Sequence, residues 1–426
     1  MVSGNPSSRA RVEAGLGKRR RREIIFRSFG LAATLVGIFF LVAFFWTLIA
    51  KGASAFAQTF VQLDIEFAEE ALAPGGELDL EFADFDSIAR TALRTKFPEV
   101  TSRNDRRELN RLISVGAGYQ IRESIIQNPE LLGKTVAMQV PAAANVDMLI
   151  KGNIDRNVPA DQRPLSDQQI HWIDALVADG SLVKKFNKAL FVNGDSREPE
   201  LAGIRGALMG SFYMLVITIA LAFPIGAAAA VYLEEFATKN RWADLIEVNI
   251  NNLAAVPSIV FGLLGLAVFI NWIGIPRSAP LVGGLVLSLL TLPVIIIAAR
   301  AAIKAVPPSI REAAFGLGAS KMQVMFHHVL PLALPGMLTG AIIGMSRALG
   351  ESAPLLMIGM VAFIVDVPAS ISDPATALPV QIYLWADSPE RAFAERTSAA
   401  IIILLGFLLL MNLAAVIMRR KVERRW

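Results

Sequence analysis

Residues 206–233 read GALMGSFYMLVITIALAFPIGAAAAVYL, a run of 28 residues without a formal charge. About 20 mostly apolar residues suffice to cross the roughly 30 Å hydrocarbon core of a bilayer as an α-helix. In lipid, only a helix or a closed barrel pairs all of its backbone N–H and C=O groups. This run therefore predicts a transmembrane helix, and it directs the search for others along the chain.

Five further runs of similar size carry few or no charges: residues 29–50, 248–276, 278–299, 322–365 and 397–418. The whole chain is 54% hydrophobic and 18% charged, whereas a typical soluble domain has about 25% charged residues. Such a chain cannot cover its apolar area with a water-facing surface. We therefore predict an all-α polytopic membrane protein with six transmembrane helices.

The basic residues predict the orientation, because Lys and Arg collect on the cytoplasmic side of a membrane. Eight of them lie within residues 1–28 and five within residues 419–426. An even number of spans places both ends on one side, so we expect both termini to be cytoplasmic. Residues 53–55 resemble a signal-peptidase site, but a signal core typically has about 7–15 residues. We therefore interpret residues 29–50 as an uncleaved first span.

Residues 51–200 are polar and long enough for a small domain. Apolar residues at every second position predict two half-buried strands: Val61, Leu63, Ile65 and Phe67, and then Leu78, Leu80 and Phe82. Residues 86–97 and 103–126 are expected to be helical, and Ser166 with Gln169 forms a capping box before another helix. With the first span preceding it, this insert is predicted to be an extracytoplasmic α+β domain. Its sequence indicates neither its role nor its partner.

The loop between the fourth and fifth runs reads REAAFGLG at residues 311–318, with Leu-Pro at 330–331. Proline at position 308 favours the start of a short helix. Small alanines permit another protein to approach closely, and a glycine permits a left-handed turn or a close contact. The residues that form this pattern are Glu312, Ala313, Ala314, Gly318, Leu330 and Pro331. An ordinary amphipathic helix that joins two spans is the alternative.

Residues 347–356, RALGESAPLL, place two formal charges inside the fifth run. Charged side chains at membrane depth are costly and mark functional sites. Arg347 and Glu351 are four residues apart and would share a helix face. A guanidinium group suits an oxyanion, so Arg347, Glu351 and Ser352 are candidates for the translocation pathway. A self-neutralising pair that holds this helix to its neighbours is the alternative, and both roles can occur at different steps of one cycle.

These motifs resemble those of one known family. The Glu-Ala-Ala, Gly and Leu-Pro spacing is similar to the EAA loop of ABC-importer permeases, although His328 stands where that loop often has an apolar residue. RALGESAPLL resembles a segment of the PstA-type permeases of phosphate importers. YLEEFA at 232–237, VPSIVFGL at 256–263 and LPVQIY at 378–383 also resemble that family. The resemblance covers about residues 200–418 and the first span, whereas the insert departs from the minimal family pattern.

The resemblance implies a type I ABC permease fold, with five helices in a core over residues 201–418 and an ATPase-coupling loop over residues 304–331. It implies a multi-pass subunit of the bacterial inner membrane whose insert is periplasmic. The implied partners are a second homologous permease, a cytoplasmic ATPase dimer that holds ATP and Mg, a periplasmic phosphate-binding protein and membrane lipid, but no nucleic acid. The chain lacks a Gly-x-x-x-x-Gly-Lys-[Ser/Thr] loop. We therefore expect it to be a transport subunit without cofactors or catalytic residues, and not an enzyme.

Three alternatives remain at this stage. An ABC permease for molybdate, sulfate or a polyamine would share the coupling loop. An ion-driven transporter would need no such loop. A sensor would place two spans around its external domain and would carry a signalling domain inside, whereas this chain has four further predicted spans.

Overall fold

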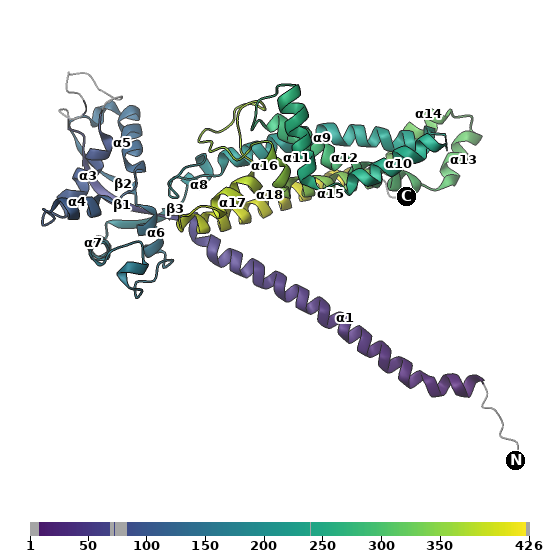
Figure 1. Cartoon of the computed structure of the whole chain (residues 1–426), viewed down its shortest axis with the longest axis horizontal. Helices are drawn as coiled ribbons and strands as arrows, with labels where there is room; N and C mark the ends of the chain where they lie inside the picture. The colour runs from purple at the N-terminus through teal and green to yellow at the C-terminus, as the bar shows by residue number, and fades with distance from the viewer. Residues whose placement is uncertain (1–7, 69–71, 73–82, 239, 423–426) are drawn as a thin grey trace, which may run out of the picture. The chain divides into compact units, whose positions relative to one another are not determined.

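The structure is a computed structural model that describes residues 8–68, 72, 83–238 and 240–422. It consists of two units, Met1–Lys51 and Gly52–Trp426, which are described separately. The described part of the first unit is helical and belongs to α1 (Ser8–Gly52) (Figure 1). This helix contains the predicted first span, and it begins within the basic N-terminal segment.

The second unit contains four helical stretches that are long and apolar enough to cross a membrane, and α1 is the fifth among the described residues. Their bounds are α9 (Arg205–Val231) with the π-helical turn η4 (Tyr232–Phe236); α12 (Pro280–Lys304); α14 (Lys321–Gln323), η6 (Val324–Val329) and α15 (Leu330–Gly350) in succession; and α18 (Ala392–Val422). Figure 1 shows α9, α12, α15 and α18 running along one another. These four helices of the second unit thus form a membrane bundle.

Small residues allow these helices to pack closely. A side chain at Gly283 or Gly284 of α12 would collide with Met214 or Ile217 of α9, and one at Gly340 of α15 would collide with Ala298 of α12. Close approach at small residues is the usual way in which helices associate in lipid, where there is no hydrophobic drive between them. The central position of α12 between α9 and α15 follows from these contacts.

The third predicted span, residues 248–276, is not one straight helix. The structure has α10 (Arg241–Ala254), then α11 (Ser258–Gly265) continuing into η5 (Leu266–Trp272), with a bend of 100° between the two parts. Pro257 lies at the break. Proline lacks a backbone N–H, and it disfavours a helical conformation in the residue before it. The described residues therefore have six spans only if this bent pair counts as one.

The fifth predicted span, residues 322–365, is a shorter helix than expected. The helix ends at Gly350, after which come the short helix α16 (Ala353–Met357) and a loop that leads to α17 (Leu378–Ala386). The last span is longer than predicted, because α18 begins at Ala392. Residues 423–426 of the basic tail lie outside the described residues.

The insert contains one antiparallel sheet with the strand order β2-β1-β3. The strands are β1 (Ala57–Glu66), β2 (Thr135–Pro141) and β3 (Leu182–Phe186), with Val61 opposite Val140 and Phe60 opposite Val183. The helices are α3 (Phe85–Lys96), α4 (Arg103–Asn110), α5 (Gly116–Gln127), α6 (Ala144–Ile150), α7 (Asp167–Ala178) and α8 (Ala189–Val192), and single 3₁₀ turns lie at Ala53–Phe56 (η1), Pro129–Leu131 (η2) and Ala160–Gln162 (η3). Val61, Leu63 and Ile65 of β1 are buried with Phe67 in one core, which confirms the first predicted strand.

Other predictions for the insert have mixed outcomes. The predicted second strand, at residues 78–82, lies outside the described residues. The helix predicted over 103–126 is wrong, because α4 ends at Asn110 and α5 begins at Gly116. Between them, Ser114 N–H donates to the carbonyl of Pro141, and Ala143 N–H donates to that of Leu112. These bonds to the end of β2 replace helical ones. The capping box is confirmed, since Ser166 and Gln169 bond reciprocally at 3.0 and 3.2 Å.

A buried carboxyl group at the end of the insert yields a stability prediction. Glu200 is 3% exposed, and among the described residues its Oε2 atom has no hydrogen-bond partner. Burial raises the pKa of Glu200, although a hydrogen bond with Ser114 partly opposes this. A raised pKa of an acid stabilises the folded state at low pH, and this stabilisation is lost as pH rises through the folded-state pKa.

We expect Glu200→Gln to raise the melting temperature of the purified chain at mildly alkaline pH, where the native carboxyl group would have to ionise inside the protein. At acidic pH, where the native group is protonated, the two proteins should melt together. Thermal unfolding in detergent at both pH values measures this. A glutamine variant that is less stable than the native chain at alkaline pH would contradict the prediction.

Candidate functional site

The coupling loop forms a short helix that is tied to the bundle. This helix, α13 (Pro308–Gly316), has Pro308 in its first turn. The Arg311 guanidinium donates two hydrogen bonds to Glu235 Oε1, at 2.8 and 3.0 Å. It also donates to the carbonyls of Val306 and Ile303, at 2.7 and 3.0 Å. Charged hydrogen bonds of this kind are worth about 1.5–3 kcal/mol each, so α13 has a defined position at the ends of α9 and α12.

The two faces of α13 differ. Ala314 is buried in a cluster with Met325 and Val329, so this alanine packs against its own chain and not toward a partner. Leu330 packs against the same cluster, and Pro331 lies half-buried in the first turn of α15. Glu312 and Ala313 are exposed. The predicted residues therefore divide into a group that supports the loop and a group that faces outward.

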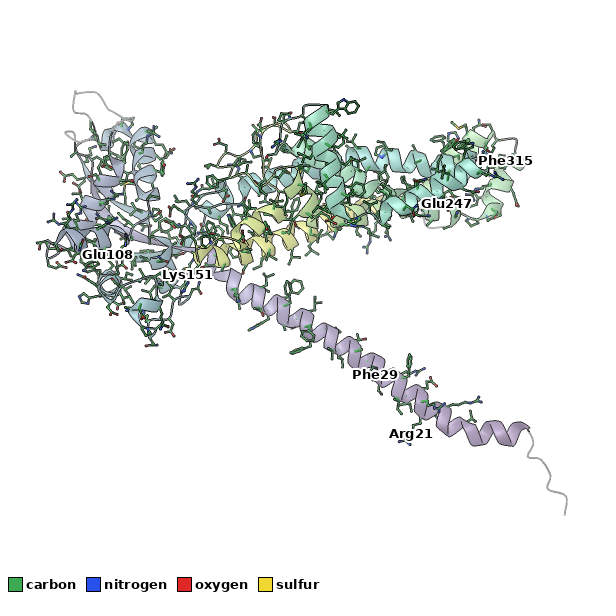
Figure 2. The ribbon with its side chains drawn as sticks, in the orientation of Figure 1. Arg21, Phe29, Glu108, Lys151, Glu247 and Phe315 are labelled. Atoms are coloured by element: carbon green, nitrogen blue, oxygen red, sulfur yellow. The ribbon has the colours of Figure 1, made fainter. Side chains whose placement is uncertain are left out.

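Two outward-facing apolar residues were not predicted from the sequence. Phe315, which is labelled in Figure 2, is 49% exposed, and Leu317 is 89% exposed. Exposed large apolar side chains that share one surface with polar residues are typical of protein contact sites. With Glu312 and Ala313 they form what we call the coupling face. No sequence signal separates them from buried apolar residues in neighbouring turns.

The end of α13 confirms the predicted left-handed turn. Gly318 has φ +83°, a conformation that favours glycine. Its N–H donates to the carbonyl of Phe315 at 2.9 Å. Ser320 and Gln323 then form a capping box that starts the next helix. This sharp reversal leaves Leu317 at the tip of the loop.

A cluster of charges next to the coupling loop joins three helices. Arg300 of α12 bonds to Glu234 of η4 at 2.5 Å and to Glu247 of α10 at 2.9 Å. Lys304 lies 3.4 Å from the same Glu234 carboxylate. The YLEEFA segment thus supplies both Glu234 and Glu235, one for this cluster and one for Arg311. These contacts fix α10 and α13 against the same end of the bundle.

The predicted pathway residues lie where α15 ends. Arg347 is in its last turn, and Glu351 caps the helix with an extended backbone. The two side chains are paired, as their spacing predicts, since Arg347 Nε lies 3.5 Å from Glu351 Oε1. Their side chains are 45% and 21% exposed. Ser352 immediately precedes α16.

Polar contacts inside the bundle hold α15 against α18. Ser346 Oγ lies 2.8 Å from Asn412 Oδ1, and Arg419 donates to Thr339 Oγ1 at 3.1 Å. Interhelical hydrogen bonds in membranes contribute about 0.6–2 kcal/mol each. They place the residue before Arg347 in contact with the last helix. The described residues contain no group of three or more His, Asp or Glu side chains arranged to hold a metal ion.

Comparison with known proteins identifies the relatives of each part. Residues 222–426 match the family described as binding-protein-dependent transport system inner membrane component. Residues 13–160 match a domain of unknown function, DUF3333. The first helix and much of the insert therefore recur together in other proteins.

Two bacterial relatives match parts of this chain. The phosphate transport system permease protein PstA 1 of Mycobacterium tuberculosis is 33% identical over 223 residues, which cover 52% of this chain and 72% of that protein. The probable ABC transporter permease protein YqgI of Bacillus subtilis is 38% identical over 155 residues. That match covers 36% of this chain and about half (52%) of the relative.

Among solved structures, an inward-facing form of the MetNI methionine ABC transporter aligns with 51% of this chain and 97% of its own. The sequence identity is 22% and the TM-score is 0.42.

Proposed function

This chain belongs to the PstA family of ABC-importer permeases, and from that membership we propose that it carries inorganic phosphate across the bacterial inner membrane. The observation that supports this substrate best is the similarity over 223 residues to a phosphate permease. That stretch is long enough to include most of the transmembrane core. Arg347, a half-exposed guanidinium in a membrane helix, suits a phosphate oxyanion.

We propose that the coupling face contacts a separate ATPase. Residues 304–331 would lie in the cytoplasm, with Glu312, Ala313, Phe315 and Leu317 against a groove of that partner. Arg311, Ala314, Gly318, Leu330 and Pro331 would hold the loop in shape. ATP and Mg belong to the partner in this proposal, and the present chain is a transport subunit and not an enzyme.

The remaining topology follows from this placement. Both termini, residues 1–28 and 419–426, would be cytoplasmic, and the first span would comprise residues 29–50. The insert, residues 51–200, would be periplasmic, on the side from which a phosphate-binding protein delivers its ligand. Residues 201–418 would form the translocation path together with a second, homologous permease.

The contacts between α13, η6 and α15 support a mechanism for this proposal. Helix α13 packs on Met325 and Val329 of η6, and η6 continues directly into α15. A displacement of α13 by the ATPase would therefore move α15, which carries Arg347. Glu351 would hold the guanidinium while the path is empty and release it to an arriving anion. If this movement were repeated with each cycle of ATP binding and hydrolysis, the path would open alternately to the two sides of the membrane.

ATP hydrolysis by the reconstituted importer tests the substrate. The complex, with its binding protein, would be placed in lipid vesicles and supplied with phosphate, sulfate or molybdate. We expect phosphate alone to stimulate hydrolysis. Stimulation by sulfate or molybdate instead would assign the chain to another oxyanion. Transport that persists with an inactive ATPase but stops when the proton gradient collapses would indicate an ion-driven transporter.

A further inference from the structure

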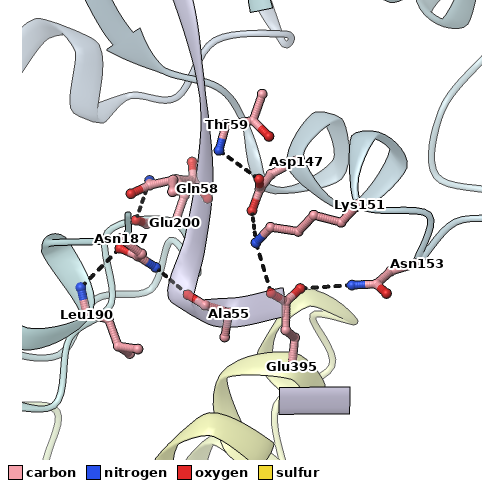
Figure 3. A network of polar contacts seen from close by, with 10 residues as sticks. All are labelled: Ala55, Gln58, Thr59, Asp147, Lys151, Asn153, Asn187, Leu190, Glu200 and Glu395. Atoms are coloured by element: carbon pink, nitrogen blue, oxygen red, sulfur yellow. Dashed lines mark hydrogen bonds and ion pairs between the residues drawn. The ribbon is translucent and has the colours of Figure 1, made fainter. Parts of the chain in front are cut away.

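The first turn of the last helix is built into the insert. Ala392 of α18 belongs to the hydrophobic core of the insert. The Glu395 carboxylate accepts one hydrogen bond from Lys151 Nζ at 2.8 Å and another from Asn153 Nδ2 at 3.0 Å. Both partners lie in the loop after α6, and Figure 3 shows the carboxylate of α18 reaching up between them. Each oxygen of Glu395 is thus held by the insert.

Lys151 extends this connection to the sheet. Its ammonium also contacts Asp147 Oδ2 at 2.6 Å, while Asp147 Oδ1 accepts from the backbone N–H of Thr59 in β1 at 2.8 Å. The side chains of Lys151, Asp147 and Glu395 are 4%, 7% and 8% exposed. Buried ion pairs tolerate little change in geometry, because separating them leaves a charge without water or partner. The central strand is therefore joined to α18 by a defined chain of contacts.

A second set of contacts, beside the first, also joins the insert to α18, and we call both sets together the junction. Asn187, which is fully buried, donates to the carbonyl of Ala55 at 2.9 Å and accepts from the N–H of Leu190 at 3.1 Å. Ala55 and Leu190 pack with Phe393 and Ala399 of α18. Arg396, the next residue of α18, is 3% exposed, and among the described residues its Nη1 atom has no hydrogen-bond partner. The junction is apolar on one side and ionic on the other.

The opposite half of α18 contacts the proposed transport path. Asn412 bonds to Ser346, and Arg419 bonds to Thr339, both on α15. Arg347 follows Ser346 directly. One continuous helix thus contacts the insert at its start and the helix of the pathway residue further along.

We propose that the described part of residues 57–192 and α18 move as one body, with Glu395 and Lys151 as the positioning residues that join them. A solute-binding protein that docks on the insert would then act on α15 and Arg347 through α18. This inference rests on the proposed function for its partner, but the one-body connection itself is independent of any substrate. In this proposal, the insert transmits the effect of binding-protein docking to the transmembrane helices.

Glu395→Gln is the informative variant, because it removes the ion pair across the junction and leaves Lys151 paired with Asp147 inside the insert. In the assembled importer we expect it to reduce stimulation of ATP hydrolysis by the loaded binding protein about tenfold, the lower end for a charged hydrogen bond, with unchanged basal hydrolysis. Glu395→Asp, which keeps the charge, should recover part of the stimulation. Asp179→Asn, which breaks the exposed Lys96–Asp179 pair within the insert, is the matched control and should have no effect.

A distance measurement tests the connection without substrate. The chain has no cysteine, so spin labels at Gln127→Cys on α5 and Leu409→Cys on α18, both exposed positions, report on the junction alone. We expect one narrow distance distribution in the assembled importer, with and without ATP, and a broader one after Glu395→Gln. A broad distribution in the parent chain, or full stimulation in Glu395→Gln, would overturn the proposal. Failure of phosphate to stimulate the parent importer would overturn the proposed function. The distance measurement would still test the connection between the insert and α18.

Discussion

Leu317→Asp is expected to abolish phosphate uptake while leaving the chain folded and inserted in the membrane. Leu317 is 89% exposed at the tip of the coupling loop, so the substitution removes little packing within the chain. In the importer it would place a carboxylate in the desolvated centre of the contact with the ATPase. Residues at such centres cost 2 kcal/mol or more when changed, about 30-fold in affinity. Co-purification of the ATPase with the variant, together with uptake, measures the effect.

Leu317→Met is the matched control, because it keeps an apolar side chain of similar volume. It should retain the ATPase and most of the uptake. Normal co-purification of the ATPase with Leu317→Asp would exclude the coupling face as the contact site. A loss of the aspartate variant from the membrane would mean that the residue is needed for folding, which its exposure does not predict.

Arg347→Ala is expected to lower phosphate uptake by about 10- to 100-fold, the equivalent of one charged hydrogen bond of about 1.5–3 kcal/mol. The half-exposed guanidinium is paired only with Glu351 among the contacts described, at 3.5 Å. Its removal should therefore alter transport far more than folding. Arg347→Lys should recover part of the activity, because an ammonium retains the charge but not the two-pronged geometry.

Glu351→Gln separates the two roles of this pair. If Glu351 positions Arg347, the glutamine variant should also impair uptake, and the ATPase should still assemble with it. If the pair only braces α15, both variants should lower the melting temperature and leave uptake per folded importer unchanged. Normal uptake in both variants would remove Arg347 and Glu351 from the translocation path.

Much of the transmembrane core could be predicted from the sequence, because apolar runs longer than a bilayer have few alternatives to a helix. The failures have local causes. Pro257 bends the third span, and α15 stops at Gly350, before the residue that was assumed to continue it. In the insert, bonds between residues 112–114 and the end of β2 interrupt a segment with helical character. The errors at the third span and in the insert arise where a proline or tertiary contacts override the periodicity of the sequence.

The candidate site was predictable only in part. The motif over residues 311–331 located the coupling loop, but it could not show that Ala314 faces inward and Leu317 outward. The contact between Lys151 and Glu395 joins residues 244 apart in the chain. A charged residue at the start of a membrane helix carries no sequence signal for such a partner. Burial and long-range pairing depend on the packed structure.

Uptake of labelled phosphate at low external concentration tests the central claim most directly. Cells that lack their own high-affinity phosphate permease would receive this chain with its proposed partners, in the native form and as Glu312→Lys and Arg347→Ala. We expect the native chain to restore uptake, and both variants to lose it at normal membrane levels. A fully assembled native complex that takes up no phosphate would contradict the account and assign this permease to another solute.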